Sequence, residues 1–121
     1  MFGHSYGLRK VDCLVKKINK DMGAEIELEP ITKTFGFCLY ATGCRLIFHD
    51  SKYSLSVQTD ASVAGDSFCE TALICDDNIM YDGTLGYNDV IRHYDIEDFE
   101  NHLIELFRLI RNSTDKDMEV S

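Results

Sequence analysis

The side chains that could do chemistry in this chain are mostly carboxylates. Residues 60–105 carry twelve Asp and Glu residues and one cation, Arg92, and the 121-residue chain has a net charge of −9. Such a surface attracts a cationic partner over long distances, although it also serves simply to keep a small protein soluble. The first interpretation predicts a partner-binding surface. Its expected residues are Asp76, Asp77, Asp82, Asp89, Glu97, Asp98 and Glu100.

The five cysteines are better explained as packing residues than as ligands or disulfides. Cys38 with Cys44 and Cys69 with Cys75 share one spacing, with five residues between the two cysteines. Structural zinc sites usually place roughly two to four residues between paired ligands. Cys69 and Cys75 would lie about 20 Å apart in an extended strand. An odd number of cysteines without an export signal favours reduced, buried thiols.

No catalytic, metal or cofactor site is expected. A Cys44–His49 dyad is conceivable, but it needs a third orienting group and a pocket, and the sequence shows neither. The acidic run at 76–83 does not fit the ligand register of a calcium loop, and no phosphate-binding glycine motif occurs. We therefore expect a protein that is not an enzyme.

Apolar periodicity predicts two helices with strands between them. Apolar residues recur every three or four positions in residues 8–22 and again from Ile96 to Ile110, and Asp95 is expected to cap the second helix. Gly23 is placed to end the first helix. Alternating or apolar runs predict strands at 25–29, 35–40, 45–49, 53–58 and 68–75, with a short hairpin arm at 79–81. Turns or loops are expected at 41–43, 60–67 and 82–87.

This order of elements predicts an α+β fold. We expect an antiparallel sheet of about five strands, with an N-terminal and a C-terminal amphipathic helix packed on it. Residues 1–112 are expected to form a single domain, and residues 113–121 a disordered polar tail.

The charge and hydropathy exclude several classes of protein. A duplex would be repelled by a chain with a pI near 4.7, so direct nucleic-acid binding is not expected. No apolar run is long enough for a membrane span, and the N-terminus lacks the pattern of a signal peptide. A cytoplasmic location is therefore expected.

Three short runs resemble small proteins of bacteriophages and mobile elements. They are Tyr53–Gln58, Phe68–Ala72 and Leu85–Val90, the last before a terminal helix. Together with their flanks they cover about half the chain. Small acidic phage proteins of this type include anti-CRISPR and anti-restriction inhibitors, so the resemblance implies an inhibitor that acts in the cytoplasm of a host cell. It carries no catalytic residues.

The leading hypothesis is a non-enzymatic interaction protein. It would bind the basic surface of a protein partner, such as a CRISPR effector or another nucleic-acid enzyme, through the carboxylates of residues 60–105. One alternative is a small enzyme or ligand-binding domain with Cys44 and His49 in a pocket. Another is a homo-oligomer, for instance a homodimer, that associates through an apolar helix face.

Overall fold

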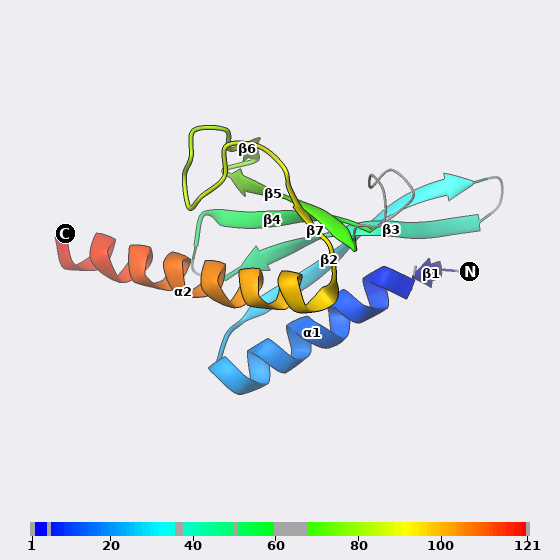
Figure 1. Cartoon of the computed structure of the whole chain (residues 1–121), viewed down its shortest axis with the longest axis horizontal. Coiled ribbons are helices and arrows are strands. Elements are labelled where there is room, and N and C mark those ends of the chain that lie inside the picture. Colours follow the sequence, from blue (N-terminus) through cyan, green and yellow to red (C-terminus); the bar gives the residue numbers. More distant parts are fainter. Residues whose placement is uncertain (1, 5, 36–37, 50, 60–67, 121) are drawn as a thin grey trace.

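A computed structural model of the chain describes residues 2–4, 6–35, 38–49, 51–59 and 68–120, and the side chains of residues 7–31, 43–49, 51–59 and 68–112 among them. Within these described ranges the chain forms seven strands and two helices (Figure 1). In chain order they are β1 (Phe2–His4), α1 (Tyr6–Met22), β2 (Ile26–Phe35), β3 (Cys38–Phe48), β4 (Tyr53–Gln58), β5 (Cys69–Cys75), β6 (Asn78–Ile79), β7 (Ile91–His93) and α2 (Ile96–Val120).

The sheet is antiparallel apart from β1. Strands β2, β3, β4 and β5 pair in sequence order, and β1 joins β3 in the parallel sense. The short strands β6 and β7 both pair with β5, β6 near its C-terminal end and β7 near its N-terminal end. The predicted α+β class, with an N-terminal and a C-terminal helix, is therefore confirmed.

Both helices cover the same face of the sheet (Figure 1). The apolar stripe of α1, with Leu14 and Ile18, and that of α2, with Phe99 and Leu103, are buried against alternate strand residues. Burying these apolar surfaces is the main stabilising contribution to a fold of this kind. The buried residues that alternate along β2, β3, β4 and β5 in this way are Ile26, Cys44, Leu46, Phe48, Leu55, Val57, Cys69, Thr71 and Leu73.

The end of α1 and the start of α2 follow the sequence signals. Gly23 has a φ of +64°, the left-handed conformation expected of a residue that ends a helix. At the start of α2, the Asp98 N–H donates to Asp95 Oδ1 at 2.8 Å, which confirms Asp95 as the cap. The helix continues through residues 113–120, where the sequence predicts a polar tail.

The turn predicted at residues 41–43 is wrong. These residues lie inside β3, and the pairing with β2 shifts register between Ile31 and Thr32, so that one extra residue of β3 forms a bulge. A Cβ on Gly43 would lie 2.6 Å from the Val57 carbonyl oxygen, so glycine lets β4 approach at this point. The glycine signal thus marks a bulge and a close contact rather than a chain reversal.

Other differences concern short or edge elements. Strand β2 runs through Pro30, and among the described residues it pairs only with β3, which is the edge position that a proline allows. Strands β1 and β7 have three residues each, too few for a periodic signal. The loop expected at 60–67 lies outside the described residues.

Candidate functional site

Three of the seven predicted partner-binding carboxylates have internal partners. Asp77 accepts from Arg45 Nη2 at 3.0 Å, and Glu100 lies 3.2 Å from Lys17 Nζ. Asp98 Oδ2 lies 3.2 Å from Nδ1 of the buried His93. These three contacts link the β5–β6 turn to β3, and α2 to α1 and to β7, so the carboxylates contribute to the fold as well as to the surface charge.

The other four, Asp76, Asp82, Asp89 and Glu97, are exposed and form no ion pair with a described residue. Asp82 accepts from the Thr84 hydroxyl and backbone N–H, and these hydrogen bonds lower the pKa of the Asp82 carboxyl. Asp89 accepts from the Val90 N–H at 2.8 Å. The first three of these carboxylates therefore sit in ordered turns between β5 and β7.

The connection that carries these carboxylates also exposes large apolar side chains. We call residues 76–95, which run along the β5 edge of the sheet, the acidic edge segment (Figure 1). It contains four of the six large apolar side chains that are exposed in the described part of the chain. They are Ile79, Tyr81, Val90 and Tyr94, and Tyr81 and Tyr94 are 61% and 72% exposed.

The first two residues of the acidic edge segment have a left-handed backbone conformation. Asp76 and Asp77 have φ values of +49° and +68° and form the two-residue turn between β5 and β6. Asp, Asn and Gly tolerate this left-handed conformation better than other residues. The two aspartates therefore meet a local conformational requirement in addition to supplying charge.

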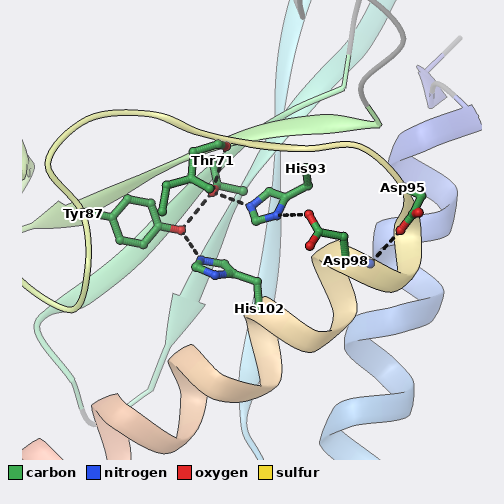
Figure 2. A network of polar contacts seen from close by, with 7 residues as sticks. Thr71, Tyr87, His93, Asp95, Asp98 and His102 are labelled. Carbon is green, nitrogen blue, oxygen red and sulfur yellow. Dashed lines mark hydrogen bonds and ion pairs between the residues drawn. The ribbon is translucent and has the colours of Figure 1, made fainter.

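A second group of polar side chains is buried between the strands and α2 (Figure 2). Thr71 Oγ1 lies 2.9 Å from the Tyr87 hydroxyl and 3.0 Å from His93 Nε2, and the Tyr87 hydroxyl lies 2.6 Å from His102 Nε2. We call these four residues the buried polar cluster. Thr71, Tyr87 and His93 are almost inaccessible, and His102 is half-buried.

The Asp98 carboxylate sets the direction of these hydrogen bonds. A carboxylate only accepts, so His93 donates from Nδ1, and the Nε2 atom of the neutral ring accepts from the Thr71 hydroxyl. The Ile91 carbonyl, at 3.5 Å, is a much longer alternative for that hydrogen. Tyr87 then donates to Thr71, and His102 donates from Nε2 to Tyr87. In this arrangement Nδ1 of the neutral His102 carries a lone pair.

Burial keeps the two histidines neutral. It lowers the pKa of His93, although the Asp98 carboxylate opposes this shift. It also lowers the pKa of His102, as would repulsion from a protonated His93, whose ring centroid is 4.7 Å away, whereas the Glu105 and Asp98 carboxylates oppose this shift. Burial raises the pKa of Tyr87 to about 12. The cluster is therefore a chain of neutral hydrogen-bonding groups near neutral pH.

Sequence reasoning missed the cluster, because its contacts are long-range. His102 is not one of the apolar residues that predict α2, and it lies at the border of their stripe, three residues after Phe99 and four before Leu106. Tyr87 is expected in a glycine-rich loop, and it is fully buried. The border position of His102 is the one available signal, and it does not identify Tyr87 as the partner.

The Cys44–His49 pair does not form a dyad. The Cys44 side chain is buried on the helix-covered face of β3, and His49 is exposed and lies 3.0 Å from Glu27. Burial raises the pKa of Cys44 and of Cys69 to about 12, which disfavours a reactive thiolate. Both behave as the packing residues that the sequence predicts, whereas Cys13 is exposed.

Comparison with other proteins identifies no relative: no family model, curated protein or solved structure matches this chain. Within the described residues, no three His, Cys, Asp or Glu side chains are grouped as a metal site requires. Neither helix in that part of the chain is long and apolar enough to cross a membrane.

Proposed function

We propose that this protein is a non-enzymatic interaction protein that uses the acidic edge segment to bind a basic surface on a protein partner. The observation that carries the proposal is the combination of exposed Tyr81 and Tyr94 with exposed carboxylates on one connection. Tyrosine is among the residues that contribute most to binding energy at protein interfaces. The tyrosines would supply contact area, and the carboxylates would select a cationic partner.

The charges of the segment are available for such a partner. Asp76, Asp82 and Asp89 have no ion pair among the described residues, and Arg92, the one cation of the segment, lies 3.4 Å from Glu70. Exposed charges act over about 10 Å at moderate salt, so they steer association more than they add affinity. An enzyme that binds nucleic acid is the favoured kind of partner, because its binding channel is lined with Arg and Lys.

The test is affinity capture with charge-matched variants. The full chain is immobilised and exposed to lysate from cells that contain it, at about 50 mM and at about 500 mM salt. One variant is Asp76→Asn with Asp82→Asn, because asparagine keeps the positive φ at residue 76 and can still accept from Thr84. The control is Glu25→Gln with Glu29→Gln, which removes two exposed carboxylates at β2, the opposite edge.

The proposal predicts a basic protein that is retained at low salt and released at high salt. Retention should fall severalfold with the Asp76 and Asp82 variant, and again with Tyr81→Ala, but not with the β2 control. If both charge variants lose retention equally, the attraction is generally electrostatic. If neither loses retention, the acidic edge segment is not part of the interface. If the only protein captured is a second copy of this chain, the homo-oligomer would be favoured.

A further inference from the structure

A pocket opens beside the outer end of the buried polar cluster. It lies between the 83–87 turn and α2, and its lining residues are Leu85, Gly86, His102, Glu105, Leu106 and Leu109. Leu109 is 41% exposed, and Glu105 is exposed at the rim. The pocket thus has an apolar wall, one carboxylate, and one histidine whose Nε2 atom is already engaged by Tyr87.

The wall formed by the turn is held in place. The Gly86 N–H donates to the Gly83 carbonyl at 3.0 Å, and the Tyr87 N–H donates to the Thr84 carbonyl at 3.0 Å. Leu85 has a φ of +52°, a conformation that is unfavourable for a leucine. The buried Tyr87 anchors this turn against α2, so Leu85 is fixed opposite Leu106 and Leu109 before any ligand binds.

The polar groups of the pocket favour a cation that can donate two hydrogen bonds. Because the cluster makes His102 donate from Nε2, its Nδ1 atom is an acceptor, and Nδ1 has no partner among the described residues. Glu105, three residues later, is a neighbour on the same helix surface and adds a negative charge. Two acceptors side by side match the fork of N–H donors of a guanidinium group.

We propose that this pocket receives an arginine side chain of the protein partner. The aliphatic stem would pack against Leu85, Leu106 and Leu109, and the guanidinium would donate to His102 Nδ1 and to the Glu105 carboxylate. This inference rests on the proposed function and makes it more specific, since Leu85 and Gly86 belong to the acidic edge segment. The lowered pKa of His102 supports it, because a neutral ring accepts a hydrogen bond that an imidazolium cannot accept.

The probe is a single capped residue, so the test does not depend on the partner. N-acetyl-arginine methylamide is titrated into the isotope-labelled full chain, and methyl signals of Leu85, Leu106 and Leu109 are followed by NMR. N-acetyl-norleucine methylamide serves as the uncharged control, and the lysine analogue tests the preference for guanidinium. We expect saturable shifts at these methyls with the arginine probe, and binding weaker by about fivefold or more with norleucine.

Two charge-matched variants of α2 complete the test. Glu105→Gln should weaken arginine binding about fivefold, whereas Glu97→Gln, an exposed carboxylate outside the pocket, should not change it. Both positions are exposed, so both variants should fold. Equal binding of arginine and norleucine, or equal effects of the two variants, would overturn the proposal.

The two proposals fail in distinguishable ways. If the partner is captured through the acidic edge segment but Glu105→Gln binds it normally and the arginine probe does not bind, only the arginine pocket is wrong. If the probe binds as expected but no partner depends on Asp76, Asp82 or Tyr81, the pocket remains and the proposed function is wrong.

Discussion

Tyr81 and Tyr87 lie six residues apart in the same connection between β5 and α2, yet Tyr81 is 61% exposed and Tyr87 is fully buried. The Tyr87 hydroxyl contacts Thr71 and His102, which belong to β5 and α2. The connection is therefore fastened at one point to the interior and presents other side chains to solvent. The comparison separates residues that hold the segment from residues available to a partner.

The same contrast applies to the charged and polar groups. Each side chain of the buried polar cluster has at least one hydrogen-bond partner, and no buried side-chain nitrogen or oxygen of the described residues lacks a partner. Asp76, Asp82 and Asp89, by contrast, form only local turn contacts. A buried polar group without a partner is costly, whereas an exposed one is not. Substitutions in the two regions should therefore have opposite consequences for stability and binding.

The largest effect is expected from truncating the buried tyrosine. Tyr87→Ala should lower the free energy of unfolding by about 3–5 kcal/mol, since it leaves a cavity beside Thr71 and His102. Tyr81→Ala should change it by less than about 0.5 kcal/mol. Urea denaturation followed by circular dichroism measures both. Similar losses of unfolding free energy for the two variants would contradict the distinction between Tyr87, which anchors the connection, and the exposed Tyr81.

A smaller effect is expected from removing the central hydroxyl of the cluster. Thr71→Val should cost about 1–3 kcal/mol, because Tyr87 and His93 both lose their hydrogen-bond partner in a buried site. Thr71→Ser keeps the hydroxyl, so it should retain the network and serves as the matched control. If the valine variant is as stable as the serine variant, the hydrogen bonds of Thr71 contribute nothing to stability.

Acid should destabilise the fold through His93 and His102, the two histidines of the buried polar cluster. Their pKa values are lowered in the native state, so below the ordinary value of 6.5 the unfolded chain binds more protons than the folded one. Stability should be complete above about pH 6.5 and decrease as the pH falls toward the native pKa values. Denaturation at a series of pH values tests this, and His102→Asn should reduce the slope. Stability that stays constant or increases as the pH falls through this range would be inconsistent with histidines that are neutral in the folded protein.

The smallest change in stability is expected at the β5–β6 turn. Asp76→Asn and Asp77→Asn should each alter the free energy of unfolding by less than about 0.5 kcal/mol, because asparagine tolerates the positive φ. Asp77→Ala should cost more, since alanine tolerates this conformation poorly and the contact with Arg45 is also lost. Thermal unfolding of the three variants measures the difference. An asparagine variant as unstable as the alanine variant would show that the charge, and not the backbone, matters there.

Local patterns were sufficient to predict most of the regular elements. The repeats through Leu14 and Ile18 and through Phe99 and Leu103 identify the two helices and their buried faces. The alternation of Leu55 and Val57 identifies β4 with its observed bounds. These predictions succeed because an amphipathic element must bury its apolar side wherever it packs.

The predictions failed where a residue's role depends on a distant strand. Gly43 is a turn signal by itself, but here it allows Val57 of β4 to approach a bulged β3. For Asp98 and Glu100, which are expected at a partner surface, the sequence did not reveal the internal partners His93 and Lys17, and their role at such a surface stays a prediction. No local pattern carries this information, because the partner residues come from other elements.

The sequence by itself determined the α+β class, the two amphipathic helices, the cap at Asp95 and the concentration of carboxylates before and at the start of α2. Only the tertiary structure decided which of those carboxylates have internal partners, which tyrosine is buried, and that Thr71, Tyr87, His93 and His102 meet. The physical reason is the range of the interactions. Periodicity and capping act between residues a few positions apart, whereas Thr71 meets His93 and Tyr87 only after β5, β7 and α2 have packed together.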